Sequence, residues 1–173
     1  MNLASFVRRV PDFPVPGILF RDITPLLADA GALRFALSAM ADPWRDRGVD
    51  LVVAIEARGF MFGTAVALEL GCGLVPVRKE GKLPWKTHST AYSLEYRSDV
   101  LHIHQDAVAP GRRVLIVDDV LATGGTARAT VELVERLEAE VLGLEFLVEL
   151  TGLQGRGLLI GREVHSLIKL EGD

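Results

Sequence analysis

The segment that most constrains the fold is residues 114–126, which read VLIVDDVLATGGT. Its first four residues are apolar, which is typical of a strand buried on both faces. Two adjacent acidic residues, Asp118 and Asp119, come at the carboxyl end of that run. After a loop of small residues, apolar side chains recur at three- and four-residue spacing from Ala127, which predicts a helix. The segment therefore predicts a strand, a tight loop and a helix, the repeating unit of α/β folds.

The small-residue loop has the chemistry of a phosphate site. A helix N-terminus offers unpaired N–H groups and the positive end of the peptide dipoles, both of which favour an anion. Gly124 and Gly125 allow the backbone to fold closely around a phosphate, while Thr123 and Thr126 add hydroxyl donors beside Ala122. The same pattern also fits an ordinary turn with a capping threonine.

The acidic pair suits a different part of a ligand. Carboxylates only accept hydrogen bonds, so Asp118 and Asp119 cannot bind the phosphate. They suit the vicinal hydroxyls of a sugar, or a magnesium ion held mostly through water. An acidic pair beside a phosphate loop predicts a ribose 5-phosphate ligand.

Composition limits the class of protein. The chain has 173 residues, 49% of them hydrophobic and 24% charged, which predicts one globular domain over residues 1–173. The net charge of −4 gives no electrostatic reason to expect nucleic-acid binding. Cys72 is the only cysteine, and neither a signal peptide nor an apolar run near the ~20 residues of a membrane helix is evident. These features predict a cytoplasmic protein that does not bind membranes.

Apolar runs alternate with helical patterns along the chain. We expect helices over residues 32–41, with an extension back to Ala28 left open, and over residues 63–70 and 127–138. The expected strands are residues 51–55, 74–77, 114–117 and 142–150. This order predicts a mainly parallel sheet flanked by helices, with ligands at the carboxyl ends of its strands. Residues 85–96 predict either an exposed hairpin or a loop that closes over a substrate.

Four basic residues lie at or just beyond the expected strand ends: Arg58, Arg78, Lys79 and Lys82. Cations placed there would stabilise the negative charge that develops on a leaving pyrophosphate. The alternative is a solvated basic rim without a ligand.

The proline-rich segment 11–25, PDFPVPGILFRDITP, presents Leu19, Phe20 and Arg21 on a stiffened backbone. A flat aromatic ring on such a loop suits stacking on a purine, whose edge the neighbouring backbone groups can bind. From the residues alone, packing of Phe20 against the core is the simpler interpretation.

These motifs together resemble the type I phosphoribosyltransferases. Residues 114–126 resemble the family's phosphoribosyl pyrophosphate signature, which implies that Asp118 and Asp119 hold the ribose and residues 122–126 the 5-phosphate. Residues 11–25, IEARGFMFG, VRKEGKLP and YSLEY resemble the adenine-specific branch in particular. The resemblance implies a mainly parallel α/β fold with a flexible loop over the active site. It also implies adenine stacked on Phe20, with its edge bonded by the backbone at Leu19 and Arg21.

The resemblance further implies transfer of the phosphoribosyl group to adenine, giving AMP and pyrophosphate, with Mg²⁺ and in a homodimer. Glu95 would take the proton from adenine N9 or steady the ribosyl cation, beside Tyr96. The Glu56–Ala57 peptide would be cis, with Arg58 at the pyrophosphate. Arg97 replaces a usual glycine, which puts the local turn in question. Two rivals are the same reaction on another purine base and a sensor of phosphoribosyl pyrophosphate without turnover.

Overall fold

The computed structural model of this chain describes residues 1–94 and 97–171. Within these residues, the main sheet has seven strands in the order β5-β6-β4-β3-β7-β8-β9. Strands β4, β3, β7, β8 and β9 run parallel to their neighbours, and the hairpin β5–β6 adds antiparallel strands at one edge. The bounds are β3 (Leu51–Ile55), β4 (Gly73–Lys79), β5 (Thr87–Leu94), β6 (Arg97–His104), β7 (Arg113–Leu121), β8 (Glu140–Leu150) and β9 (Val164–Leu170).

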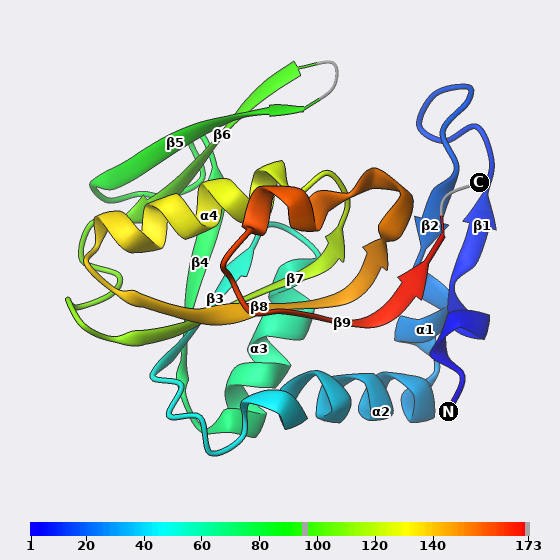
Figure 1. Cartoon of the computed structure of the whole chain (residues 1–173), viewed down its shortest axis with the longest axis horizontal. Helices are drawn as coiled ribbons and strands as arrows, with labels where there is room; N and C mark the ends of the chain where they lie inside the picture. Colours follow the sequence, from blue (N-terminus) through cyan, green and yellow to red (C-terminus); the bar gives the residue numbers. More distant parts are fainter. Residues whose placement is uncertain (95–96, 172–173) are drawn as a thin grey trace.

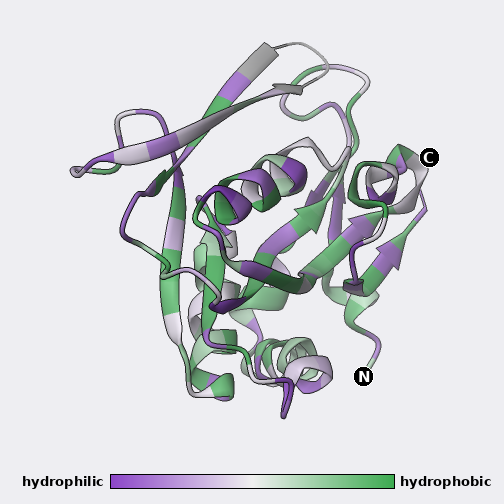
Figure 2. Cartoon of the chain, turned by 60° about the vertical axis from the view of Figure 1, so that its left-hand side comes forward, coloured by the Kyte–Doolittle hydropathy of each residue, from purple (hydrophilic) through white to green (hydrophobic). Residues whose placement is uncertain are grey.

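Helices cover both faces of the sheet, as Figure 1 shows: α2 (Ala30–Ala41) and α3 (Gly59–Leu70) lie on one side and α4 (Gly125–Arg136) on the other. Side chains of β3 alternate between the two layers, because Val53 packs in the same buried cluster as the apolar face of α4 and Val52 in that of α2 and α3. Hydrophobic colour accordingly runs along the central strands in Figure 2. The predicted α/β class with a mainly parallel, doubly covered sheet is confirmed.

Smaller elements surround this frame. A second sheet pairs β1 (Arg8–Val10) with β2 (Phe20–Asp22) in antiparallel register. The short helices are η1 (Leu3–Phe6), α1 (Thr24–Ala28), η2 (Asp42–Trp44), η3 (Thr151–Leu153) and η4 (Gly155–Leu159). The sequence patterns predicted neither the small sheet nor β9. No helix among residues 1–94 and 97–171 is long and apolar enough to cross a membrane.

Several predicted boundaries were wrong by a few residues. Helix α3 begins at Gly59, not residue 63, since the chain turns into the helix directly after β3. Strand β7 continues to Leu121, so the acidic pair lies within the strand and not beyond it. The open extension before residue 32 is a separate helix, because Asp29 caps α2 by accepting a hydrogen bond from Ala32 N at 2.8 Å. Of the two alternatives for residues 85–96, the described part forms a hairpin strand.

Candidate active site

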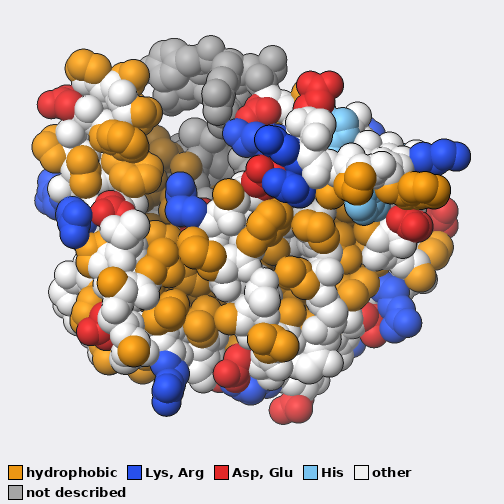
Figure 3. Space-filling model, turned by 180° about the vertical axis from the view of Figure 1, so that it is seen from behind, with side chains coloured by type: hydrophobic (Ala, Val, Ile, Leu, Met, Phe, Trp, Pro, Cys, Tyr) orange, Lys and Arg blue, Asp and Glu red, His pale blue; other side chains and the backbone are white. Residues whose placement is uncertain are grey.

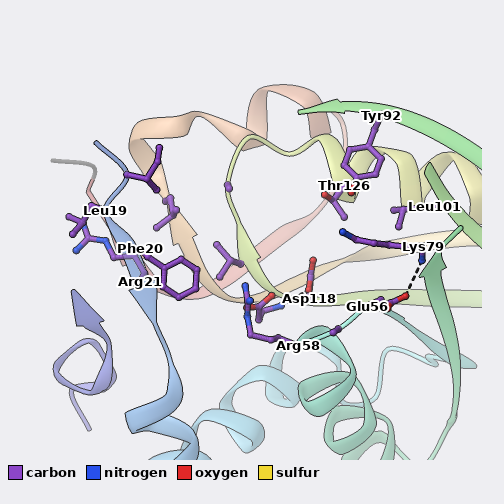
Figure 4. Close-up of a pocket in the computed structure, with 16 residues that line it drawn as sticks. Leu19, Phe20, Arg21, Glu56, Arg58, Lys79, Tyr92, Leu101, Asp118 and Thr126 are labelled. Atoms are coloured by element: carbon purple, nitrogen blue, oxygen red, sulfur yellow. Dashed lines mark hydrogen bonds and ion pairs between the residues drawn. The ribbon is translucent and has the colours of Figure 1, made fainter. Parts of the chain in front are cut away.

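A cavity of about 380 Å³ opens at the carboxyl ends of β3 and β7. The segment around β2, the turn after β3, the end of β7 and the hairpin each contribute to its wall (Figure 4). Most of the predicted substrate-binding residues line it: Leu19, Phe20, Arg21, Arg58, Lys79, Asp118, Asp119, Ala122 and Thr126. Strand ends far apart in the sequence meet here because parallel strands present their carboxyl ends at the same edge.

The acidic pair is buried at the cavity floor. Asp118 is 9% exposed and Asp119 5%, and Asp118 Oδ1 accepts a hydrogen bond from Asp119 N at 2.8 Å. Burial, and then the neighbouring charge of Asp119, raises the pKa of Asp118 well above its usual value. Asp119 is compensated instead by Arg58, whose Nε donates to its carboxylate. A side chain at Gly59 would collide with Asp118 Oδ1, 2.7 Å from the added Cβ, so glycine lets α3 start against the acidic pair.

The turn after β3 places Arg58 beside the acidic pair. Glu56 holds this turn, because its carboxylate accepts from Arg78 at 3.2 and 3.3 Å and from Lys79 N at 3.0 Å. The Glu56–Ala57 peptide is cis, as the resemblance implied. The Arg58 guanidinium lies 5.8 Å from the centre of the Phe20 ring. Arg58 therefore sits between the acidic pair and the aromatic side of the cavity.

The predicted phosphate loop forms the N-terminus of α4. Gly124 caps the helix with φ of +85°, a conformation that favours glycine. The first helical hydrogen bond runs from Arg128 N to Gly124 O at 2.9 Å. The N–H groups of residues 125–127 have no partner of this kind and remain available to an anion. Thr123 and Gly124 line a small adjoining cavity of about 80 Å³, and Gly125 lies on the outer side of the loop.

Phe20 begins β2 and is half-buried at the other end of the cavity. Its ring packs edge-on against Phe13, with centroids 5.1 Å apart, and projects into the cavity in Figure 4. Leu150 adds apolar wall beside it. The Arg21 side chain donates to Glu171 O at 3.1 Å, which joins this segment to the end of β9. The site thus has an aromatic, apolar end and an acidic, anion-binding end.

Other predicted residues lie elsewhere. Arg78 supports Glu56 and donates to Lys82 O at 3.1 Å, and neither Arg78 nor Lys82 lines the cavity. The Lys79 ammonium pairs with Asp99 at 3.0 Å. Glu95, Tyr96 and the turn before Arg97 lie outside the described residues. Their predicted roles are therefore not placed.

Sequence reasoning missed three contributors. Glu56 follows a buried strand directly, and an acidic residue at that position was itself the available signal. Tyr92 reaches the cavity wall from β5, where the alternation of a two-faced strand was too weak to recognise. Val120 lines the cavity because β7 extends further than its apolar run indicated.

Comparison with known proteins agrees with this geometry. Residues 29–157 match the model of the phosphoribosyl transferase domain. The chain is 54% identical over 173 residues to an adenine phosphoribosyltransferase of Rhodopirellula baltica, covering 100% of this chain and 84% of the relative. The crystal structure of an adenine phosphoribosyltransferase from Thermoanaerobacter pseudethanolicus superposes with a TM-score of 0.94 at 52% identity, covering 97% of this chain and 98% of that one. The enzyme of Saccharomyces cerevisiae, crystallised with an imino-altritol bisphosphate and adenine, gives a TM-score of 0.89 at 41% identity, covering 95% and 96% of the two chains.

Proposed function

The chain belongs to the phosphoribosyl transferase family, and from this premise we propose what its cavity does. The chain transfers the 5-phosphoribosyl group from phosphoribosyl pyrophosphate to adenine, giving AMP and pyrophosphate, a step of purine salvage. The observation that carries this function is one cavity in which a buried acidic pair, a helix-start anion loop and an aromatic ring meet.

The acidic end suits the ribose and its 5-phosphate. Ribose hydroxyls would donate to Asp118 and Asp119, which are acceptors already aimed at the cavity. The phosphate would accept hydrogen bonds from the free N–H groups at the start of α4 and from Thr123 and Thr126. When the hydroxyls replace the guanidinium at Asp119, Arg58 is released to bind the pyrophosphate, with Lys79 beside it.

The aromatic end suits the base. Adenine would stack on Phe20, and the backbone N–H and C=O groups of Leu19 and Arg21 would bond its N1 and amino edge. Adenine N9 would then face the sugar end of the cavity. The hairpin forms one wall through Tyr92, and its movement over the substrate would exclude water from the cation-like ribose.

Bond exchange occurs at ribose C1. As the bond from C1 to the pyrophosphate oxygen lengthens, positive charge grows on the ribose and the N9 lone pair forms the new bond. Glu95 would accept the N9 proton or steady the cation, while Arg58 and Lys82 would stabilise the leaving pyrophosphate.

Magnesium fits the donor set at the cavity floor. Two adjacent carboxylates, Asp118 and Asp119, match the way Mg²⁺ is held in phosphate sites, by one or two carboxylates plus water and substrate oxygens. When bound, the ion would neutralise charge on the pyrophosphate. Both carboxylates would contact it through water, since they also serve the ribose hydroxyls.

An assay for AMP tests the proposed function. With phosphoribosyl pyrophosphate and Mg²⁺, we expect product from adenine and none from hypoxanthine or guanine. Excess EDTA should stop the reaction, and added Mg²⁺ should restore it. Product from another base would keep the ribosyl site and contradict the Phe20 base site. Binding of phosphoribosyl pyrophosphate without product from any base would favour the sensor.

We also propose that the active form is a homodimer. The outer faces of α2, α3 and β4 expose four large apolar side chains: Phe35, Met61, Leu68 and Leu74. Helix α3 contacts both α2 and β4, and Figure 3 shows hydrophobic side chains gathered on the rear of the molecule. Exposed apolar surface of this kind marks association sites.

Leu68→Glu tests the dimer, because Leu68 is 77% exposed and its replacement leaves the core intact. Light scattering after size exclusion should give about twice 18.8 kDa for the wild type and about one such mass for the variant. Leu158→Glu, at an exposed apolar position in η4, is the matched control and should stay dimeric. A monomeric wild type would contradict the proposal.

A cytoplasmic location is the remaining proposal. Cys72 is a free, half-buried cysteine. Burial raises the pKa of its thiol, which leaves it protonated and unreactive at neutral pH. A single inert thiol suits a reducing compartment.

A further inference from the structure

The segment after β8 packs directly against the phosphate loop. Gly155, the first residue of η4, is buried beneath residues 122–124. A Cβ added at Gly155 would lie 2.2 Å from Ala122 O and 3.0 Å from Gly124 N. A Cβ added at Gly124 would lie 2.3 Å from Gly155 O. Two glycines therefore let two backbones approach more closely than any side chain allows.

The requirement for glycine at position 155 comes from this contact and not from backbone strain. Gly155 has no positive φ, unlike Gly124 at +85°. An alanine could adopt the same backbone conformation, but its methyl group would meet the carbonyl oxygen of Ala122. Either η4 or the phosphate loop must then move. Gly157, two residues further along η4, has nothing within 4 Å of an added Cβ.

Arg156 holds η4 in place. Its guanidinium donates to both carboxylate oxygens of Glu149 at 2.7 Å each, and to Val164 O at 2.7 Å. Glu149 is 6% exposed and also accepts from Arg156's neighbour Ser166. These bonds tie η4 to the ends of β8 and β9, which are rigid parts of the sheet. Because η4 is fixed, the loop is the part that yields when Gly155 gains a side chain.

We propose that Gly155, fixed by Arg156, is a positioning residue for the phosphate loop. The proposal rests on the proposed function, in which this loop holds the 5-phosphate. Gly155 contacts residues 122–124 immediately before the free N–H groups of α4, so its backbone sets where those donors point. Anion binding by such groups depends steeply on position, since a 1 Å misplacement costs about 10²-fold in comparable sites. Gly155 itself touches neither the base end nor the acidic pair.

Steady-state kinetics of Gly155→Ala, with Gly157→Ala as matched control, tests this role. We expect the KM for phosphoribosyl pyrophosphate to rise about tenfold in Gly155→Ala, with the KM for adenine changed less than twofold. Calorimetry with ribose 5-phosphate should show a similar loss of affinity without any turnover. Gly157→Ala should behave as the wild type in both measurements.

A second variant covers failure of Gly155→Ala to fold. Arg156→Lys keeps the charge but loses the two-oxygen contact with Glu149, and it should weaken ribose 5-phosphate binding by about fivefold. Arg47→Lys is its control, because Arg47 makes the same kind of contact with Glu163 away from the loop, at 3.1 and 2.9 Å. It should leave binding unchanged.

The outcomes separate this inference from the proposed function. Unchanged ribose 5-phosphate affinity in folded Gly155→Ala, or in Arg156→Lys if the former does not fold, overturns the positioning role. An equal rise in both KM values also overturns it. If the wild type binds ribose 5-phosphate but makes no AMP, the function fails while the affinities still decide the role of Gly155. No binding of ribose 5-phosphate by the wild type overturns both.

Discussion

Replacing both Asp118 and Asp119 with asparagine should lower kcat/KM by at least about 100-fold. The carboxamides keep the shape of the carboxylates but lose the charge that orients the ribose hydroxyls and stabilises the developing cation. Stability should not fall, because burial already raises the pKa of Asp118 and an uncharged side chain removes that cost. The measurement is steady-state AMP formation together with thermal unfolding of the same preparations.

The matched control is Asp50→Asn. Asp50 lies before β3, at the opposite end of the strand from the cavity, and accepts from Arg113 N at 2.8 Å. Its replacement should leave kcat/KM within about twofold of wild type, the scale of a surface change remote from the site. If the double variant is folded and retains the wild-type kcat/KM, Asp118 and Asp119 do not have the role proposed for them.

Glu145→Gln should make the protein considerably more stable at pH 9 and leave its stability at pH 4 nearly unchanged. Glu145 is 2% exposed inside the α2 layer, and its carboxylate accepts a hydrogen bond from Trp44 Nε1 at 2.7 Å. Burial raises its pKa from 4.5 to about 8, despite the bond from Trp44. A glutamine resembles the protonated form and cannot ionise.

The sign follows from the two states. Below pH 4.5 Glu145 is protonated whether the chain is folded or unfolded. Between pH 4.5 and about 8 only the unfolded chain releases the proton, so the free energy of unfolding falls as pH rises. Above that range the lost stability reaches a plateau of at most about 5 kcal/mol. The variant should regain a few kcal/mol of it at pH 9, measured by urea unfolding at both pH values.

Glu163→Gln is the control for this effect. Glu163 is ionised in the fold, because hydrogen bonds from Arg47 lower its pKa to about 2. Removing its charge should therefore give no gain at pH 9. A Glu145→Gln protein whose advantage over wild type is the same at pH 4 and pH 9 would show that Glu145 is not protonated in the folded state.

Much of the active site could be predicted because its chemistry is local. The apolar run before Asp118 and the glycines after Thr123 lie within thirteen residues, and backbone geometry alone makes such a segment a strand, an anion loop and a helix. The same local logic placed Phe20 on a stiffened segment. Element ends were less accurate, because β7 and α3 are extended by pairing and packing with distant parts of the chain.

The basic residues show where local reasoning ended. Arg58, Arg78 and Lys82 form one group by composition and position in the sequence, but their surroundings in the fold differ. Arg58 reaches the cavity and Asp119, Arg78 is taken up by Glu56, and Lys82 lies exposed outside the cavity. Which cation meets a ligand depends on the direction of each side chain relative to the sheet, and residue type does not encode that direction.

The sequence by itself determined the parallel sheet, the acidic pair and the phosphate loop, because hydrophobic period, charge and glycine content act over neighbouring residues. Only the tertiary structure decided that Gly155 lies against Gly124, and that Glu145 is buried beside Trp44. Those contacts join residues 31 and 101 positions apart, and their existence depends on how β8 and its neighbours pack. Close approach and desolvation are properties of the packed chain, so no local pattern announces them.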